Sequence, residues 1–478
     1  MTGATVALLE EATMSGHVVN LRELLDDPAS ARFQRLLILL LCCFMCVEGY
    51  DMQVLGYAAP AMIKALHTSK SGLGVVFGAA MFGFMIGAFI IGNLGDTIGR
   101  KKAIIGGLIT FGLFTLGTSF ATTIPELLIM RALAGIGLGG AVPNAVALMA
   151  EYAPSKRRAF YVAVLYIGYT IGSAAGGVIA ARMIPVEGWP SVFILGGVTP
   201  LLVALLLLGT LPESVRFLAL RGKRPEQALG LLRRIRPDLS FPVGTTIAAE
   251  EEVRPGIPAK HLFTEGRALI SILLWVGAIG NMMTHHFMTS WLPTALNSGG
   301  LPLSTSIIAT AVMQALGAFG SLFIGYAVDR VGVMALAVLL ILGVPCVIGL
   351  GHLNGSEALL LGLVGGTGFF LIGGQTGLNA VAGTIYPTYM RSTGTGWANA
   401  MGRFGAMLGP MLGGVILSLS LPLSTVFLLS AAPVLISACA LFALAQVQKS
   451  RGQTRPRGGP TREMPRAQPT LMDGSPVP

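Results

Sequence analysis

The sequence has few charged residues for its length. Asp, Glu, Lys and Arg together make up 11% of the 478 residues, whereas hydrophobic residues make up 53% and the mean hydropathy is +0.73. A soluble globular domain carries about 25% charged residues, so this chain has too little polar surface for a water-soluble fold. Low charge together with 64 glycines instead favours helices packed closely in a lipid bilayer.

Cysteine and histidine are also scarce, with five and six residues. The cysteines lie within apolar runs and lack the spacing of a metal site or a disulfide framework. The sequence has no GxxxxGK[ST] motif, which argues against ATP-driven transport by this chain. We therefore expect no metal, no cofactor and no enzymatic activity. The net charge of +10 raises nucleic acid as a partner, but the basic residues lie between hydrophobic runs, so we expect no nucleic-acid binding.

Long apolar runs make up most of the chain, and about 20 such residues span a bilayer. Twelve runs qualify, at residues 36–58, 73–94, 103–121, 125–148, 160–182, 190–211, 267–291, 304–327, 333–351, 357–380, 393–417 and 422–445. We therefore predict an all-α integral membrane protein with twelve transmembrane helices. The predicted parts are an N-terminal segment (1–35), a six-helix half (36–211), a central loop (212–266), a second six-helix half (267–445) and a disordered basic tail (446–478).

The basic residues predict the orientation. With the N-terminus inside, 27 of the 32 Lys and Arg residues fall on the inner side and three (Lys64, Lys70 and Arg182) on the outer side. Lys and Arg accumulate in cytoplasmic loops. The basic residues therefore predict a multi-pass protein with both termini in the cytoplasm. We further expect a monomer in the bacterial inner membrane.

The two halves repeat each other. GNLGDTIGRKK follows the second run and GYAVDRVG follows the eighth, with the same glycine–aspartate–glycine spacing. NAVA recurs 235 residues later, and GYTIGSAAGG in the fifth run corresponds to GAMLGPMLGG in the eleventh. Two six-helix halves in parallel repeat are a transporter architecture, with the binding site between the halves near the middle of the membrane.

Four charged residues stand inside the predicted spans. Glu48 and Asp51 are three residues apart, which places them on one helix face, and Arg131 and Arg403 lie in the fourth and eleventh runs. Charges at bilayer depth are costly, so they are expected to face a wet cavity or a partner. With a rise of about 1.5 Å per residue, Asp51 and Arg131 lie at one depth, and Glu48 and Arg403 lie at a similar one.

We interpret Glu48, Asp51 and Arg131 as the proton-coupling group. Arg403 is the expected ligand of a substrate carboxylate, because a guanidinium binds a carboxylate through two parallel hydrogen bonds. The alternative is a static buried ion network that fixes the packing of the first helix against the fourth.

Several motifs resemble those of known transporters. GNLGDTIGRKK, RALAGIGLGG and LPES resemble signatures of the major facilitator superfamily, and the resemblance extends from about residue 36 to 445. EGYDMQVLGYAAPAM, GLGGAVPNAVALMAEYAP and GGQTGLNAVAGTIYPTYMRSTGTGWANAMGRFGAMLGP resemble the aromatic acid:proton symporter family. That family imports benzoate-like acids such as 4-hydroxybenzoate, protocatechuate, gentisate and 3-hydroxyphenylpropionate.

The resemblance implies import of an aromatic carboxylate by proton symport with alternating access, driven by the proton gradient without a cofactor. This sequence departs from the family pattern at two places. The first acid of the motif is usually Asp and is Glu48 here, and no basic run follows Asp329 in the second half.

The resemblance also implies a gating role for the loop after the second run and for related positions. The expected gating residues are Gly92, Asp96, Gly99, Arg100, Lys101, Lys102, Glu151, Arg157, Asp329 and Arg391. Aromatic and amide side chains suit an aromatic acid. The expected substrate contacts besides Arg403 are Tyr50, Gln314, Gln375, Asn379, His285 and Trp397. Each has a lipid-facing or interfacial position as its alternative. His285 and His286 are adjacent, so at most one of them can face a cavity.

Other functions remain open at the level of sequence. They are a proton-coupled transporter of another small organic acid such as muconate, an exporter of small organic compounds, and a membrane receptor for aromatic acids. Intact repeats and charges in mid-membrane favour transport over sensing. Ser173 occupies the proline position of the GxxxGPxxGG pattern found in proton antiporters, which favours symport.

Overall fold

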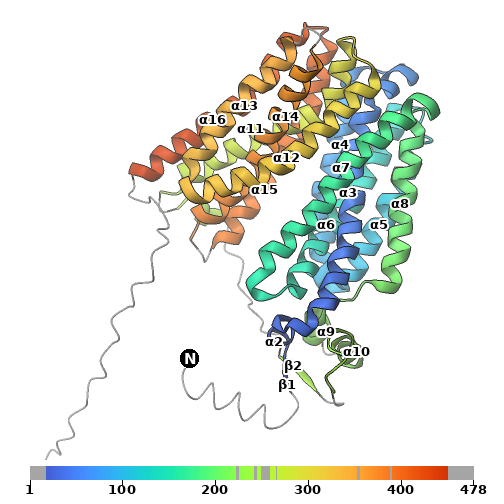
Figure 1. Ribbon diagram of the computed structural model, residues 1–478, viewed down its shortest axis with the longest axis vertical. Helices are drawn as coiled ribbons and strands as arrows, with labels where there is room; N and C mark the ends of the chain where they lie inside the picture. Colours follow the sequence, from blue (N-terminus) through green and yellow to red (C-terminus); the bar gives the residue numbers. More distant parts are fainter. Residues whose placement is uncertain are drawn as a thin grey trace, which may run out of the picture.

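The computed structural model describes residues 18–221, 225–241, 245–248, 259–264, 266–352, 356–387 and 390–450. It is a bundle of long helices in two halves, coloured blue to green and yellow to red in Figure 1. Most of the expected C-terminal tail, from residue 451 onward, lies outside the described residues.

Each half contains the expected succession of long helices. The first half consists of α3 (Ala31–Ala65), α4 (Lys70–Ile98), α5 (Arg100–Thr118), α6 (Ile124–Tyr152), α7 (Arg158–Glu187) and α8 (Trp189–Thr210). The second consists of α11 (Ala268–Ser298), α12 (Leu303–Val331), α13 (Val333–Gly349), α14 (Glu357–Ile385), α15 (Arg391–Ser418) and α16 (Leu423–Ser450).

Within the described ranges, eleven helices are long and apolar enough to cross a membrane. The remaining expected span is α5, which has 19 residues and begins with three basic ones, Arg100, Lys101 and Lys102. It nevertheless packs along α6 and α8 as a full member of the bundle. The helices extend beyond the predicted runs because polar residues at both ends continue the same helix.

Glycines end two corresponding helices. Gly99 follows α4 with a φ of 103°, and Gly332 follows α12 with a φ of 86°. Both angles lie in the left-handed region, which side chains with a Cβ rarely adopt. Because these two glycines come from matching motifs, the repeat seen in the sequence is also a repeat of local backbone structure.

Small elements cover one end of the first half, called the linker end here because α8 finishes and α11 begins there. They are α2 (Leu21–Asp26), α9 (Val215–Arg221), α10 (Pro225–Ile235) and the short 3-10 turns η1 (Pro28–Ser30) and η2 (Ser155–Arg157). Two more such turns belong to the second half: η3 (Ala259–Leu262) packs beside α11 and α15, and η4 (Leu350–His352) follows α13. Two strands, β1 (Val18–Asn20) and β2 (Thr246–Ala248), pair in parallel. This strand pair is a small addition to the predicted all-α fold.

The N-terminal segment is attached to this group by polar contacts. Arg236 pairs with Asp27 at 2.7 Å and with Asp238 at 2.6 Å. The Gln34 side chain donates to the carbonyl oxygens of Leu25 and Tyr152. Residues before the first span and residues of the central loop therefore form one structured unit on the first half.

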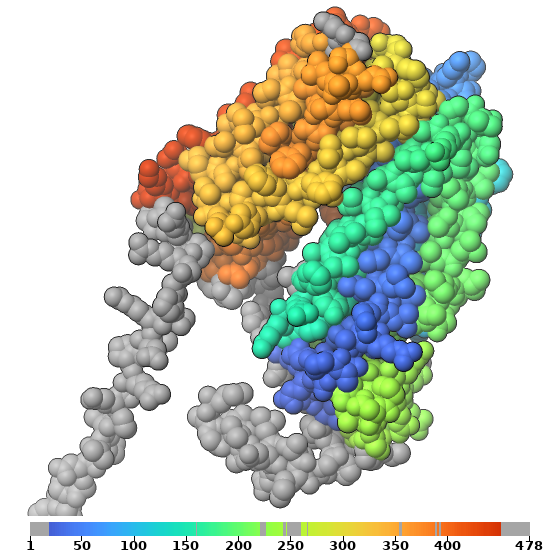
Figure 2. Space-filling view, in the orientation of Figure 1, coloured from blue at the N-terminus to red at the C-terminus, as the bar shows by residue number. Residues whose placement is uncertain are grey.

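The two halves touch mainly at the end opposite the linker end. There the backbone N–H of Ser71 donates to Ser418 Oγ at 3.0 Å, and a Cβ on Gly74 would lie 3.1 Å from the carbonyl oxygen of Pro410. Figure 2 shows the halves in contact toward the top and diverging below. The arrangement leaves access to the space between the halves from the linker end.

Candidate functional site

A cavity lies between the two halves, near the middle of the long helices. Its walls come from α3, α4 and α6 of the first half and from α11 and α15 of the second. The lining is mostly apolar and includes the rings of Phe77 and Phe84. Its charged or polar side chains are those of Asp51, Arg131, His286 and Ser290. A mainly apolar pocket with a few polar groups is the usual form of a small-molecule site.

Asp51 and Arg131 form a bidentate ion pair on the first-half wall. Arg131 donates from one terminal nitrogen to Oδ1 at 3.0 Å and from the other to Oδ2 at 2.7 Å, and both side chains are 4% exposed. Thr115 supports the pair, because its hydroxyl oxygen lies 3.3 Å from Arg131 and 3.5 Å from Asp51. This contact agrees with the equal membrane depths that helix rise predicts for Asp51 and Arg131.

The glycine between the two acids of α3 has a packing role. A Cβ on Gly49 would lie 2.0 Å from the carbonyl oxygen of Tyr169 in α7. The hydroxyl of Ser173 donates to the Gly49 carbonyl at 3.0 Å. Close approach of α7 therefore requires a glycine here, which fixes the direction in which Glu48 and Asp51 point.

Glu48 and Arg403 form no ion pair among the described residues. Glu48 is buried, and its Oε2 has no hydrogen-bond partner within the described part of the chain. The guanidinium carbon of Arg403 lies 4.3 Å from the centre of the Phe84 ring, across the interface between the halves. A cation over an aromatic face is held there by the ring's negative face, and its hydrogen-bond donors remain available for an anion.

The expected amide contacts lie on the second half. Asn281 Nδ2 donates to Gln375 Oε1 at 3.3 Å, and Gln375 Nε2 donates to Asn379 Oδ1 at 3.3 Å. Asn379 is exposed, while Gln314 is buried and donates to Thr289 Oγ1 at 3.5 Å. None of the three expected contacts, Gln314, Gln375 and Asn379, is among the residues that line the cavity.

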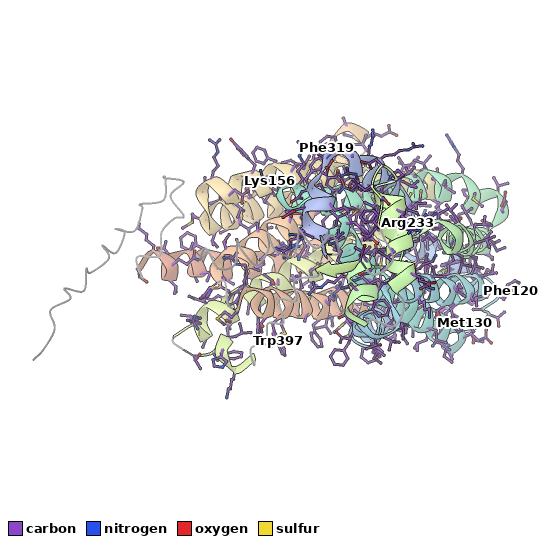
Figure 3. All side chains as sticks on the ribbon, turned by 90° about the horizontal axis from the view of Figure 1, so that it is seen from below. Phe120, Met130, Lys156, Arg233, Phe319 and Trp397 are labelled. Carbon is purple, nitrogen blue, oxygen red and sulfur yellow. The ribbon has the colours of Figure 1, made fainter. Side chains whose placement is uncertain are left out.

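Three other expected contacts lie away from the cavity lining. The Tyr50 hydroxyl donates to the carbonyl of Val192 at 2.8 Å, so it is used in packing α3 against α8. Trp397 is 42% exposed, stacks on Trp275 and lies at the edge of the molecule in Figure 3. His286, rather than His285, lines the cavity. Both ring nitrogens of His285 are buried without a hydrogen-bond partner among the residues described.

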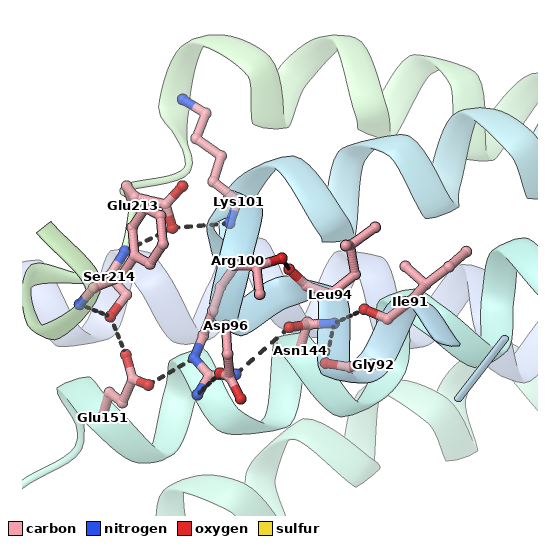
Figure 4. Close-up of polar contacts among 12 residues, drawn as sticks. Ile91, Gly92, Leu94, Asp96, Arg100, Lys101, Asn144, Glu151, Glu213 and Ser214 are labelled. Carbon is pink, nitrogen blue, oxygen red and sulfur yellow. Dashed lines mark hydrogen bonds and ion pairs between the residues drawn. The ribbon is translucent and has the colours of Figure 1, made fainter. Parts of the chain in front are cut away.

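Four of the expected gating residues of the first half belong to one network at the linker end (Figure 4), namely Asp96, Arg100, Lys101 and Glu151. Arg100 pairs with Asp96 at 3.1 Å and with Glu151 at 2.6 Å. Glu151 also accepts a hydrogen bond from Ser214, and Glu213 accepts one from the backbone N–H of Lys101 at 3.1 Å. The network ties α4, α5, α6 and the segment after α8 together.

Glycines and Asn144 allow the segments of this network to approach one another closely. A Cβ on Gly95 would lie 1.7 Å from Asn144 Oδ1, and a Cβ on Gly99 would lie 2.3 Å from Glu213. Asn144 also donates to the Gly92 carbonyl at 3.4 Å. The spacing that identifies the motif is therefore the spacing at which α4 can approach α6.

The corresponding residues of the second half are arranged differently. Asp329 is exposed and takes part in no salt bridge among the described residues, and its neighbour Arg330 lies over the ring of Tyr326. Arg391 is exposed at the linker end, as are Lys102 and Arg157 of the first half. Among the described residues, salt bridges thus hold Asp96 of the first-half motif, and none holds the corresponding Asp329.

Sequence reasoning missed Phe84, Thr115, His286 and Ser290. Thr115 and Ser290 are neutral and small, and nothing in their local sequence distinguishes them from other helix residues. Phe84 becomes relevant only through its contact with Arg403. The adjacency of His285 and His286 was a usable signal, but the rotation of α11 decides which of the two faces the cavity.

Comparison with known proteins gives concordant results. The family model of the Major Facilitator Superfamily matches residues 41–379. A gallate transporter of Pseudomonas putida is 35% identical over 89% of this chain and 95% of its own length. The 4-hydroxybenzoate transporter PcaK of Acinetobacter baylyi is 34% identical over 88% of this chain and 93% of its own.

A solved structure supports the fold. A bacterial homologue of the human lysosomal transporter Spinster, in an inward-facing and occupied conformation, superimposes with a TM-score of 0.65. The alignment covers 90% of this chain and 98% of that one, at 17% identity. At this identity the likeness concerns the arrangement of helices alone.

Proposed function

Because the chain belongs to the major facilitator superfamily, we propose that it is a secondary transporter that imports an aromatic carboxylate together with protons. One observation carries the proposal. Arg403 is not itself one of the lining residues, but it lies over Phe84, whose ring lines the cavity, and it forms no salt bridge with any residue that the structure describes. An unpaired guanidinium beside an aromatic ring suits a ligand that has a carboxylate and an aromatic ring. The gallate and 4-hydroxybenzoate transporters among its relatives support this substrate class.

In the proposed mechanism, Arg403 binds the carboxylate and the acids of α3 carry the proton. Asp51 is held by Arg131 in this conformation through a bidentate ion pair. Glu48 is buried and lacks a partner on Oε2 among the described residues, so it is suited to hold a proton. Movement of α3 relative to α6 and α15 would change which acid faces an arginine, and would thereby load and release the proton.

The proposed orientation places the linker end in the bacterial cytoplasm. The excess of basic residues on that side supports it. The halves meet at the opposite end, so the conformation described here is open toward the cytoplasm. The network around Arg100 would then act as the cytoplasmic gate, with Asp329 and Arg391 as its second-half members.

The experiment uses the full chain reconstituted in liposomes with labelled 4-hydroxybenzoate. An inward proton gradient should drive accumulation, and collapsing the gradient should abolish accumulation while leaving counterflow intact. Equal accumulation without the gradient would refute symport. Absence of counterflow would instead indicate a receptor that binds without transporting.

Arg403→Gln tests the carboxylate contact. It should reduce uptake at least about tenfold, since a charge-assisted hydrogen bond contributes about 1.5–3 kcal/mol. Arg330→Gln is the matched control, because Arg330 also lies over an aromatic ring, but that ring, Tyr326, does not line the cavity as Phe84 does. The control should transport normally. Equal activity of the two variants would exclude Arg403 as the substrate ligand.

A further inference from the structure

Two polar side chains that line the cavity take no part in the Asp51–Arg131 ion pair or in the contact between Arg403 and Phe84. His286 and Ser290 both lie on α11 and both line the cavity. They are four residues apart, so they occupy one helix face about 6 Å apart. Neither side chain makes a hydrogen bond to another residue in the described part of the chain. Polar groups in a mostly apolar cavity lose water when a ligand enters, and they then need a partner on that ligand.

The other two polar side chains on the cavity wall, Asp51 and Arg131, are engaged with each other. Asp51 uses both carboxylate oxygens on Arg131, and Arg131 uses both terminal nitrogens on Asp51. A ligand hydroxyl that approached this pair would have to compete with a bidentate charged contact. His286 and Ser290 are therefore the groups on the lining that are free to accept or donate a hydrogen bond to a neutral hydroxyl.

His286 and Ser290 lie further from the linker end than Arg403, toward the end at which the two halves meet. Helices α11 and α15 run in parallel, and Gly405 and Gly409 of α15 lie against the carbonyls of Ile279 and Met283 of α11. This register places His286 about nine positions, or ~13 Å of helix rise, further from the linker end than Arg403. The side chains of Arg403 and His286, with one substituted ring between them, can span that distance.

Aromatic rings and one main-chain contact close the cavity beyond Ser290. The rings of Phe77 and Trp291 pack edge to face with centres 5.3 Å apart, and Trp291 Nε1 donates to the Pro410 carbonyl at 2.7 Å. Phe77 and Phe84 are seven residues apart on α4, about 10 Å, and both line the cavity. Both rings therefore offer aromatic surface to a ligand in the cavity.

We propose that His286 and Ser290 select the ring hydroxyl of the substrate, at the end of the ring opposite the carboxylate. The inference rests on the proposed function and deepens it. The substrate is a hydroxylated benzoate, oriented with its carboxylate toward Arg403 near the open end and its hydroxyl toward α11. A site built to hydrogen-bond a hydroxyl discriminates strongly against the analogue that lacks it, because its own polar groups then stay unpaired.

The test measures half-saturation concentrations for 4-hydroxybenzoate and benzoate by counterflow in liposomes, with the full chain. The ratio of the benzoate value to the 4-hydroxybenzoate value reports the contribution of the hydroxyl. We expect a ratio of at least about 10 for the wild type, equivalent to about 1.4 kcal/mol. His286→Phe and Ser290→Ala should each lower the ratio by raising the 4-hydroxybenzoate value, with the benzoate value changed less than about twofold.

His352→Phe is the matched control, since His352 lies in η4, outside the cavity lining; it should keep the wild-type ratio. Ser290→Ala removes a single oxygen and guards against a His286 variant that does not fold. A wild-type ratio near 1, or an unchanged ratio in both variants, would overturn this inference while the proposed function stands. A wild-type protein that exchanges neither acid would refute the proposed function itself, and the inference with it.

Discussion

Replacing Asp51 with asparagine should destabilise the protein more than its small change in shape suggests. The substitution keeps the volume of the side chain but removes the charge opposite Arg131, and both side chains are 4% exposed. Arg131 Nε already lacks a hydrogen-bond partner among the described residues. The variant would therefore leave a buried guanidinium with one neutral acceptor in place of two charged ones.

The expected cost is about 3–5 kcal/mol, the range found when one partner of a buried pair is removed. Replacing both partners by apolar residues, in Asp51→Leu with Arg131→Met, should cost far less, since buried pairs replaced by apolar groups of similar volume are often neutral in stability. The double variant should thus be more stable than Asp51→Asn alone. This order distinguishes an unpaired charge from a simple loss of packing.

The assay is unfolding in detergent, monitored by intrinsic fluorescence against a denaturant, for the wild type, the single variant and the double variant. Uphill transport should be lost in both variants if Asp51 carries the proton. A single variant within about 1 kcal/mol of the wild type, or a double variant less stable than the single one, would refute the reasoning from the buried pair.

Two further predictions concern packing and the linker end. Gly49→Ala should prevent stable folding, because its Cβ would lie 2.0 Å from the Tyr169 carbonyl oxygen. Gly106→Ala is the control and should behave as the wild type, because its Cβ would have no heavy atom within 4 Å. The measurement is size-exclusion chromatography, and a Gly49→Ala protein with the wild-type profile would contradict the prediction. Arg236→Ala should raise hydrogen exchange in β1 at neutral pH. The pKa of Asp27 is lowered by the Ala29 backbone N–H and by Arg236, so its contribution is present above about pH 4 and lost as the pH falls through the lowered pKa. In the wild type, loss of protection against exchange in β1, relative to the intrinsic rate, as the pH is lowered from about 8 to 5 would contradict this sign.

Helix number and charge depth were predictable because both depend on distance along one helix. The apolar runs correspond to long helices, and helix rise alone placed Asp51 level with Arg131, which the salt bridge agrees with. The glycine–aspartate–glycine repeat likewise marked two helix ends with the same backbone conformation. These features need no knowledge of how neighbouring helices are rotated.

Features that depend on helix rotation were not predictable. His286 rather than His285 lines the cavity, and Trp397 lies on the outer surface. Adjacent helix residues point about 100° apart, so the packing partners of α11 and α15 decide which side chain faces inward. The pairing of β1 with β2 joins segments more than 220 positions apart, and two three-residue strands carry too little pattern to be recognised.

The two halves handle their charges differently, and this difference bears on how the transporter would close. Two ion pairs lie within the first half, Asp51 with Arg131 and Arg100 with Glu151. Arg403 of the second half makes its cation contact with a first-half ring, that of Phe84. A substrate anion bound to Arg403 would neutralise the charge that now lies at the interface between the halves. Closure around the loaded site should therefore cost less than closure around the empty one, since burying an unpaired charge is expensive.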